Sequence, residues 1–345
     1  MIPKVSICVP NLNMLPFLPE RFESILCQSH TDFELFVFDS HSDDGAWEFI
    51  QRLASRDKRM RLMQGPREGP YPAWNQCVAH TTGEFVYIAT SDDTMADDCI
   101  EKLLRALERN EHCDLAHCPL RVIDAANVPI VPSRWPSTTV FASDLPELIN
   151  LRHIRKAPYD GLLHLTGRHV YLSVTQLLIR RTLFRKIGPF PNKWGNISDF
   201  NWEMRAGLVA DTVHVPDTWA SWRLHARQAT NFDDLQSPER LKNLEEMIAD
   251  AIRHSSPFLD PEVLDCPWTR VTHNLRTYYA DLGSRRSKMD RRLFQLGQLL
   301  VGEPEVRAEV INAFSRERKW PRRAPHRIRL WLEKKGLGPA INYET

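Results

Sequence analysis

The chain has 345 residues, with 45 lysines and arginines against 44 aspartates and glutamates, which gives a formal net charge of +1. This balance excludes an overall charge bias toward nucleic acid or acidic substrates. The apolar content of 42% is ordinary for a globular protein, and the length suffices for one large α/β domain plus an appendage. No apolar run reaches the roughly 20 residues that span a bilayer, and no signal-peptide pattern opens the sequence.

Strand and helix signals alternate from Val5 to Cys118. Short apolar runs predict strands, and apolar residues spaced three and four positions apart predict helices. The expected elements are strand Val5–Val9, helix Leu18–Gln28, strand Glu34–Phe38, helix Gly45–Arg56, strand Met60–Met63, helix Ala73–His80, strand Phe85–Ala89, helix Asp97–Asn110 and strand Asp114–Cys118. The alternation predicts an α/β fold with a mostly parallel, doubly wound sheet that carries helices on both faces.

The remainder of the chain divides into a proline-rich part and a helical part. Residues 119–175 contain six prolines and are expected to form loops with short strands. The elements expected next are strand Val174–Arg180, helix Asp199–Val209, strands Thr212–Pro216 and Trp219–Leu224, and then helices only, at Pro238–His254, Pro261–Asp281, Lys288–Val301, Glu303–Arg318 and near His326–Lys335. We therefore expect a domain over residues 1–231 and a helical C-terminal region over 232–345.

The seven cysteines are odd in number and include no Cys-x-x-Cys pair. Most have apolar neighbours in the sequence, which favours buried free thiols in a reducing cytoplasm over disulfides or a zinc site. A cytoplasmic protein is the expectation.

Two adjacent carboxylates, Asp92 and Asp93, follow the predicted strand Phe85–Ala89 directly. Open α/β sheets bind ligands at the carboxyl ends of their strands, and a buried carboxylate needs a partner or a metal. Carboxylate oxygens suit Mg²⁺ or Mn²⁺, which commonly bind phosphates as well. The alternative is an acidic turn that caps the next helix, and the pair alone does not decide between the two.

Four segments, in this order, resemble family 2 glycosyltransferases of the GT-A fold. The resemblance spans roughly residues 4–231, and its ordered motifs recur among enzymes that build bacterial surface polysaccharides. The segments are Val5–Asn13, Phe38–Gly45, Gly69–Asn75 continued by Gly83-Glu84 and Ser91-Asp92-Asp93, and Ser198-Asp199-Phe200 continued by Arg223–Gln228. Thr90 departs from the fuller Asp-x-Asp form of the motif, and Ser198 stands where relatives often carry Glu.

The resemblance implies a role for individual residues. It implies nucleotide contacts by Pro10, Asn11, Asn13, Asp39, Asn75 and Asp92, a Mn²⁺ or Mg²⁺ site at Asp92, Asp93 and His225, diphosphate contacts by Arg223 and Gln228, and a catalytic base at Asp199. Structural alternatives stay open for several of them. Asp39 also fits an Asx-turn, Asp199 also fits a helix cap, and Arg223 with His225 also fits a buried structural pair. Arg67 fits a phosphate contact less well than a solvated side chain.

The segment from Phe314 to Lys335 is basic, with nine lysines and arginines against two glutamates. Trp and Leu residues lie between the charges, a pattern that fits an anionic membrane surface. Peripheral contact with the inner face of the cytoplasmic membrane is thus one interpretation, and a solvated helix or a homodimer contact are the others. Nucleic-acid binding is not expected.

These observations predict an inverting, metal-dependent glycosyltransferase. The donor would be a UDP- or dTDP-sugar, and the acceptor a hydroxyl of a bacterial surface glycan or a lipid-linked molecule. The alternatives are a non-catalytic subunit that binds sugar nucleotides and a nucleotidyltransferase. The latter would favour a glycine- and arginine-rich phosphate loop after the first strand, which Pro10–Asn13 lacks.

Overall fold

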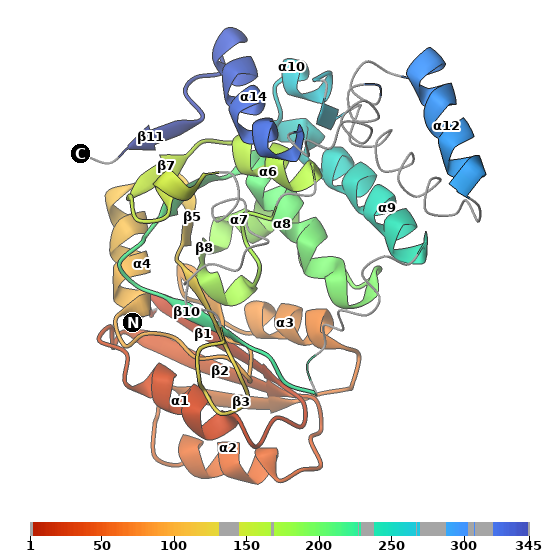
Figure 1. Ribbon diagram of the computed structural model, residues 1–345. Helices are drawn as coiled ribbons and strands as arrows, with labels where there is room; N and C mark the ends of the chain where they lie inside the picture. The colour runs from red at the N-terminus through yellow and green to blue at the C-terminus, as the bar shows by residue number, and fades with distance from the viewer. Residues whose placement is uncertain are drawn as a thin grey trace.

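The computed structural model describes residues 3–130, 145–166, 169–226, 228, 238–266, 268–269, 288–302, 307 and 320–343. Strands and helices alternate in its first part as predicted (Figure 1). They are β1 (Val5–Asn11), α1 (Leu18–Leu26), β2 (Phe33–Asp39), α2 (Ala46–Ala54), β3 (Met60–Gln64), α3 (Pro70–Ala79), β4 (Phe85–Ile88), α4 (Cys99–Arg109) and β5 (Cys113–His117). Each predicted element of this part is present, with ends that differ by a few residues.

The middle of the chain contains more regular structure than its prolines predict. Its elements are β6 (Leu120–Ile123), η1 (Pro146–Leu148), β7 (His153–Arg155), α6 (Tyr159–Leu165), η2 (Val174–Gln176), β8 (Leu177–Arg180), α7 (Arg181–Ile187), η3 (Gly195–Ile197), α8 (Ser198–Val209), β9 (Asp211–His214) and β10 (Ala220–Arg223). Every residue of α6 is buried, so this helix has no polar face and its sequence lacks the amphipathic period on which prediction relies.

The central sheet is mixed, with the strand order β11-β7-β9-β5-β8-β4-β1-β2-β3, where β11 is Ile341–Tyr343. Strands β4, β1, β2 and β3 form a parallel block. The predicted α/β class and its parallel core are confirmed. Two strands depart from the predicted doubly wound sheet: β8 runs antiparallel between β4 and β5, and β7 runs antiparallel to both β9 and β11.

Helices cover both faces of the sheet, and each face has its own hydrophobic core. Val5, Ile7 and Val9 of β1 point to the face covered by α1, α2 and α4, while Cys8 points to the face covered by α3, α6 and α8. Because β1 is buried on both faces, its sequence is a continuous apolar run rather than an alternating one. The seven cysteines are free, and six of them are buried, as expected.

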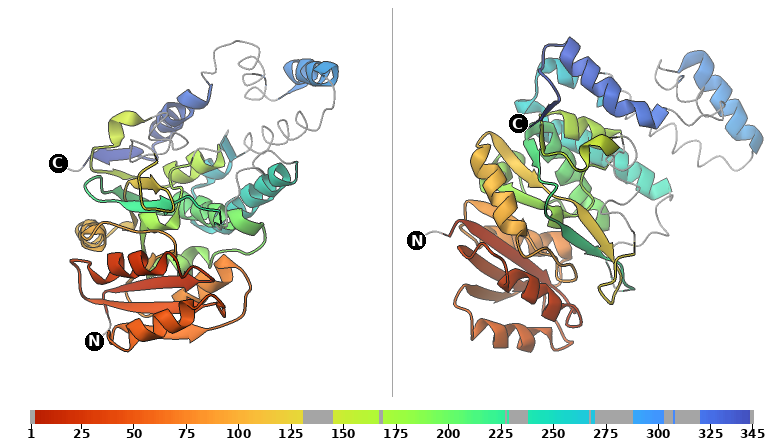
Figure 2. Two further views of the ribbon diagram at one scale, coloured as in Figure 1. Left: turned by 60° about the horizontal axis from the view of Figure 1, so that its bottom comes forward. Right: turned by 60° about the vertical axis from the view of Figure 1, so that its left-hand side comes forward.

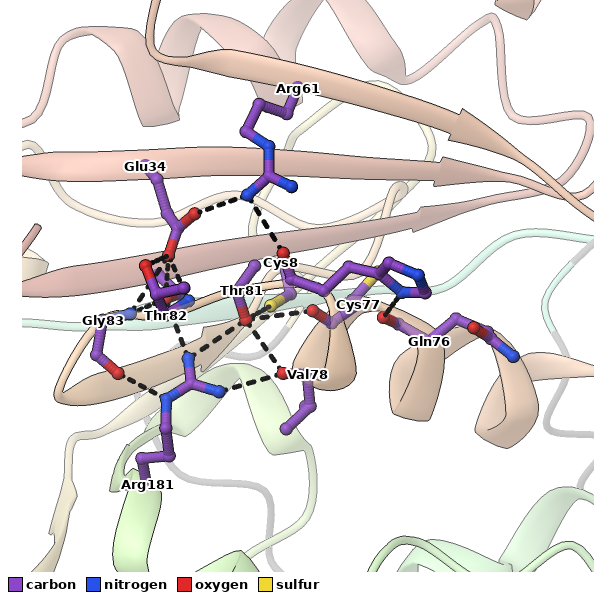
Figure 3. Close-up of polar contacts among 12 residues, drawn as sticks. Cys8, Glu34, Arg61, Gln76, Cys77, Val78, Thr81, Thr82, Gly83 and Arg181 are labelled. Atoms are coloured by element: carbon purple, nitrogen blue, oxygen red, sulfur yellow. Dashed lines mark hydrogen bonds and ion pairs between the residues drawn. The ribbon is translucent and has the colours of Figure 1, made fainter. Parts of the chain in front are cut away.

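A buried polar network closes the amino edge of the parallel strands (Figure 3). Glu34 accepts hydrogen bonds from the Ser6 hydroxyl at 2.8 Å and from the Gly83 N–H at 3.0 Å. Arg181 donates to the carbonyl of Val78 at 2.9 Å and to the same Ser6 hydroxyl at 3.0 Å. Burial alone would raise the pKa of Glu34, but hydrogen bonds from Thr82, Ser6 and Gly83 outweigh it and lower the pKa. The donors and acceptors of this network thus satisfy one another.

The C-terminal region is helical, as predicted, with one addition. It contains α9 (Pro238–Ser255), η5 (Ser256–Phe258), α10 (Pro261–Leu264), α12 (Lys288–Val301), α14 (Trp320–Lys334) and the strand β11. The expectation of helices only is wrong at β11, which is too short to show a strand pattern and pairs antiparallel with β7 at the sheet edge. The predicted continuous helix Pro261–Asp281 is wrong within its first two turns, because α10 ends at Leu264 with Asp265 as its C-cap. Residues 270–281, the boundary predicted at 231/232, and helix Glu303–Arg318 apart from residue 307 lie outside the described residues.

The C-terminal helices lie on the side of the molecule away from α1 and α2 (Figures 1 and 2). Asn201 of α8 donates to the carbonyl of Met247 in α9 at 2.7 Å, and the Tyr159 hydroxyl of α6 donates to the carbonyl of Pro325 in α14 at 3.3 Å. Ile328 and Leu332 of α14 belong to the same hydrophobic core as α6 and α8. Among the described residues, no helix is both long and apolar enough to cross a membrane.

Helices α6 and α8 approach closely because each has a glycine at the crossing point. A Cβ on Gly207 would lie 2.6 Å from the backbone nitrogen of Gly161. Gly207→Ala is therefore expected to lower the free energy of unfolding by about 2 kcal/mol, because backbone atoms cannot move aside as a side chain does. Urea denaturation measures the effect. The control is Gly297→Ala in α12, where nothing lies within 4 Å. Helix propensity there predicts a gain of up to about 1 kcal/mol, and equal losses in both variants would contradict the interpretation.

Candidate active site

Polar residues collect at the carboxyl edge of the parallel strands, opposite the Glu34 network. Asn11 ends β1 and pairs in register with Asp39, which ends β2. The turn that holds Asp92 follows β4, and α3 begins at Pro70 shortly after β3 ends. Because the four strands are parallel, these segments meet at one edge of the sheet, where such sheets bind ligands.

The two carboxylates of the turn after β4 point in different directions. Asp93 is 2% exposed. It accepts hydrogen bonds from the Arg223 backbone N–H at 2.8 Å and from the Thr90 hydroxyl. Burial and the nearby charge of Asp92 raise the pKa of Asp93 to about 7. Both oxygens of Asp93 thus hold the turn together in this structure, and Thr90, which departs from the motif, supplies one of the donors.

Asp92 is the carboxylate presented outward, with a side chain that is 21% exposed. Its Oδ2 lies 3.0 Å from Nε2 of His225, and the imidazole packs on the ring of Phe17 at a centroid distance of 4.5 Å. Across the described residues, no group of three or more His, Cys, Asp or Glu side chains is placed to hold a metal by itself. One carboxylate and one imidazole form a partial donor set, and a divalent ion held there would take its remaining ligands from phosphate oxygens and water.

Arg223 is fully buried beside the turn that holds Asp92. Its guanidinium donates to the Asp92 carbonyl at 2.6 Å, to Glu20 at 2.7 Å and to the carbonyl of Asp124 at 3.2 Å. The guanidinium donors are thus directed at the turn and at α1 in this structure, and the diphosphate contact predicted for Arg223 stays a prediction. The structural alternative is the one that the geometry supports.

Gln228 lies at the turn after β10. Its side-chain oxygen accepts from the backbone N–H of His225 at 3.1 Å, and the backbone N–H of Gln228 donates to the His225 carbonyl at 3.2 Å. Gln228 therefore sets the position of His225, and its predicted diphosphate contact stays a prediction.

Asp39 is fully buried and accepts four hydrogen bonds. Two come from the Ser42 N–H and hydroxyl, at 2.9 and 2.6 Å, and the others from Asn11 at 2.7 Å and Gln64 at 3.1 Å. The Asx-turn alternative is thus present in the structure. The side-chain oxygen of Asn11, by contrast, is buried and has no hydrogen-bond partner among the described residues. Next to it, the Pro10 carbonyl accepts from the Ser91 hydroxyl at 2.6 Å.

Two of the predicted nucleotide contacts are engaged elsewhere. The amide of Asn13 exchanges two hydrogen bonds of 2.9 Å with Asp43. The amide of Asn75 exchanges hydrogen bonds of 2.8 and 3.0 Å with the backbone of Phe190. Both side chains therefore hold loops in place in this structure. A nucleotide contact by either residue would have to use the second N–H of its side-chain amide. Arg67 is likewise a loop brace, with a donor to Asp43 at 2.7 Å.

Asp199 lies in the first turn of α8 and is half-buried. Its Oδ1 accepts from the Tyr71 hydroxyl at 3.0 Å and from the Phe200 N–H at 2.9 Å. Burial raises the pKa of Asp199 to about 6, although the Tyr71 hydrogen bond opposes the rise. Tyr71 belongs to the first turn of α3, so its bond to Asp199 places this carboxylate at the same edge as the Asp92 turn.

A model described as Glycosyl transferase family 2 matches residues 6–188, which is more than half of the chain. The chain belongs to this family. The matched residues include β1, β2, β4 and the Asp92 turn, but end before Asp199 and His225.

Relatives with curated names support the assignment over part of their length. An uncharacterized glycosyltransferase of Rickettsia felis is 34% identical over 107 residues, which cover 31% of this chain and 18% of that protein. The uncharacterized glycosyltransferase EpsJ of Bacillus subtilis is 24% identical over 62% of this chain and 61% of its own length. A PGL/p-HBAD biosynthesis glycosyltransferase of Mycobacterium bovis is 26% identical over 62% of this chain and 75% of its own length. The chain thus spans less than two thirds of the length of the first two of these relatives.

Solved structures support the predicted GT-A architecture. S. aureus TarS 1-349 in complex with UDP has a TM-score of 0.53 at 15% identity, over 96% of this chain and 92% of that one. The mannosyltransferase PcManGT of Pyrobaculum calidifontis, in complex with GDP-Man and Mn²⁺, has a TM-score of 0.51 at 20% identity, over 96% and 88% of the two chains. At these identities the likeness shows the fold alone. It confirms the predicted GT-A fold.

Sequence reasoning missed the side chains that support the site of this family 2 member. Tyr71 binds Asp199, Phe17 packs on His225, and Glu20 pairs with Arg223. None of the three belongs to a motif of charged residues, and each acts on a partner more than 100 residues away in the chain. The signal that could have found Tyr71 is its Pro-Tyr-Pro setting, which is typical of a rigid helix start, but nothing in the sequence indicates its partner Asp199.

Proposed function

We propose that the protein is an inverting, metal-dependent glycosyltransferase. It would move a sugar from a UDP- or dTDP-linked donor to a hydroxyl of a bacterial surface glycan or of a lipid-linked acceptor. The observation that carries the proposal is the meeting of two polar groups at one sheet edge: the pair of Asp92 and His225, and the carboxylate of Asp199 held by Tyr71. Membership of the family supports the reaction class.

The end of β1 is the proposed site of the nucleotide base. The unpartnered Oδ1 of Asn11 is a buried acceptor, and uracil and thymine carry an imide N–H that would satisfy it. Asp39 would line this site by orienting Asn11 through their 2.7 Å hydrogen bond. TarS has been solved with UDP and with UDP-GlcNAc, which is compatible with a uridine nucleotide.

Asp92 and His225 are the residues proposed to hold the divalent ion, with donor phosphates as its other ligands. When bound, a divalent ion neutralises the negative charge that builds on the departing nucleoside diphosphate. Asp93 is proposed to have a supporting role. Its hydrogen bonds with Thr90 and the Arg223 backbone hold the turn in place, and this orients the side chain of Asp92 toward the ion. The proposed ion is Mn²⁺ or Mg²⁺. PcManGT has been solved with Mn²⁺.

Asp199 is proposed to act as the catalytic base. Its carboxylate takes the proton of the acceptor hydroxyl while the hydroxyl oxygen forms a bond to the anomeric carbon. The bond between that carbon and the diphosphate oxygen breaks, and the oxygen leaves with the electron pair. Attack from the face opposite the leaving group inverts the anomeric centre. With a pKa of about 6, Asp199 is mostly ionised at pH 7 yet basic enough to share a proton in the transition state.

Nucleotide binding tests the metal part of this proposal. UDP should bind more weakly by about tenfold or more after chelation or in Asp92→Asn, because a neutral amide is a poor ligand for a hard cation. Calorimetric titration with UDP, with and without Mn²⁺, measures this. The matched control is Asp97→Asn, outside the turn. Affinity that is unchanged by chelation and by Asp92→Asn would remove the metal site, and no binding of UDP, dTDP or GDP under any condition would remove the proposed function.

The two alternative functions, a non-catalytic subunit and a nucleotidyltransferase, can be distinguished from the proposed reaction by what the protein releases. A non-catalytic subunit would bind a sugar nucleotide without releasing nucleoside diphosphate. A nucleotidyltransferase would release pyrophosphate from a nucleoside triphosphate. Release of nucleoside diphosphate from a nucleotide sugar is expected only of the proposed reaction.

Peripheral membrane contact through residues 314–335 is a further part of the proposal. In the described part of this segment, Leu330 and Lys334 are exposed, while Ile328 and Leu332 are buried against the body. Vesicles with anionic lipid should sediment the protein, and Leu330→Glu combined with Lys334→Glu should weaken this severalfold because apolar and charge contacts are both lost. Sedimentation that is identical for both proteins, or equal with neutral vesicles, would end this part of the proposal.

A further inference from the structure

Tyr71 approaches the two oxygens of Asp199 unequally. Oδ1 accepts two hydrogen bonds, from the Tyr71 hydroxyl at 3.0 Å and from the Phe200 N–H at 2.9 Å. Oδ2 has no hydrogen bond from any described residue. A carboxylate anchored through one oxygen keeps the lone pairs of the other for a ligand.

Tyr71 is itself held rigidly. It lies between Pro70 and Pro72 in the first turn of α3, after Gly69, whose φ of +101° favours glycine. Its ring is 3% exposed and packs edge-on against Trp74 at a centroid distance of 5.0 Å. The hydroxyl oxygen on such a ring has a fixed position, so its placement beside Asp199 is set before any ligand arrives.

The ionisation of the surrounding groups makes Tyr71 a donor. Burial and the charge of Asp199 raise the pKa of Tyr71, so its hydroxyl keeps its proton throughout the working range. Glu203, one turn along α8, is the other ionisable group beside Asp199. Burial and the charge of Asp199 raise the pKa of Glu203 well above its usual range. The pKa of Asp199 is in turn lowered by the hydrogen bond from Tyr71, so this side chain stabilises the ionised form of Asp199.

We propose that Tyr71 is the positioning residue of the catalytic base: its hydroxyl fixes Oδ1 of Asp199 and leaves Oδ2 as the atom that takes the proton of the acceptor. This inference rests on the proposed role of Asp199 and extends it to a residue of another helix. It assigns to Tyr71 two effects, on the direction of the carboxylate and on its ionisation.

Tyr71→Phe tests the inference because it removes only the hydroxyl. Loss of a donor to the charged form raises the pKa of Asp199 further. The acid limb of the rate of nucleoside diphosphate release should move up by about half a unit to one unit. The variant would then be about three- to tenfold slower than wild type at pH 5.5 and within about twofold at pH 8. Tyr159→Phe is the matched control, since its buried hydroxyl binds the Pro325 carbonyl instead.

A second readout needs no donor sugar. The stability lost in Tyr71→Phe should be larger at pH 8 than at pH 5, because protonated Asp199 has less need of the donor. The loss in Tyr159→Phe should be the same at both values.

The outcomes separate this inference from the proposed function. If Asp199→Asn abolishes activity but Tyr71→Phe leaves the acid limb where it is, or slows the reaction equally at every pH, Tyr71 is only a packing residue. If Asp199→Asn stays active, the base assignment itself fails. A pH-independent loss of stability in Tyr71→Phe also overturns the inference, whatever the activity.

Discussion

Replacing Asp199 with asparagine is expected to lower sugar transfer by a factor of about 10² to 10⁴, which is the usual contribution of a positioned base. Asparagine keeps the size of the side chain and its Oδ1 acceptor, so the contacts with Tyr71 and Phe200 at 3.0 and 2.9 Å can persist. What is lost is the oxygen that takes the proton. The measurement is release of nucleoside diphosphate from the donor that binds best in a panel of UDP-, dTDP- and GDP-sugars with Mn²⁺.

The control for this prediction separates chemistry from binding. UDP affinity of Asp199→Asn should equal that of wild type, because Asp199 lies on α8 and not on the strand ends proposed to bind the nucleotide. Asp260→Asn, at the exposed start of α10, should leave transfer unchanged. Full transfer by Asp199→Asn with normal UDP binding would show that another group accepts the proton.

The second large effect is expected on stability in mild acid. Three histidines stand in one row across the sheet: His117 of β5 and His153 of β7 are both register partners of His214 in β9. All three are fully buried. Nε2 of His153 lies 3.0 Å from a guanidinium nitrogen of Arg155, and its Nδ1 lies 2.7 Å from the carbonyl of Leu151. The ring is therefore neutral, since it accepts from one group and donates to the other.

Burial and the charge of Arg155 lower the pKa of His153 to about 2 and that of His214 to about 3. Below pH 6.5 the unfolded chain binds protons that the folded rings do not, so stability is lost as the pH falls from about 6.5 toward these values. The cost is about 1.4 kcal/mol per pH unit for each ring. Asp93 and Asp199, whose pKa values are raised to about 7 and about 6, act in the opposite direction over the same range. Only a comparison of variants isolates the histidines.

His153→Gln supplies that comparison. At pH 7.5 the variant should be less stable than wild type, but between pH 6.5 and 4.5 the difference should shrink or reverse by about 2.7 kcal/mol, because glutamine has no proton to bind. Urea denaturation at several pH values measures it. His326→Gln, on the exposed surface of α14, is the matched control and should leave the difference constant. A constant difference for His153→Gln as well would mean that this ring does not stay neutral in the folded state.

The pattern of apolar residues was enough to determine the first half of the fold. Strand β1 and helix α4 each bury a large apolar surface whose spacing reports the secondary structure directly. The four ordered motifs were likewise local, so the sequence predicted the family, which is confirmed, and pointed to the Asp92 turn and Asp199 as candidate site residues.

The tertiary structure alone decided how the polar residues divide between scaffold and site. A carboxylate in the sequence has the same chemistry whether it faces a ligand or a backbone N–H. Asp93, Asn75 and Arg223 are engaged within the protein because partners from distant segments reach them. These partners are the Arg223 backbone, the Phe190 backbone and Glu20, respectively. Tyr71 acquired a role for the converse reason, through a partner 128 positions away. Such contacts depend on which elements the sheet order brings together, and β8, inserted antiparallel between β4 and β5, shows that this order is not contained in local periodicity.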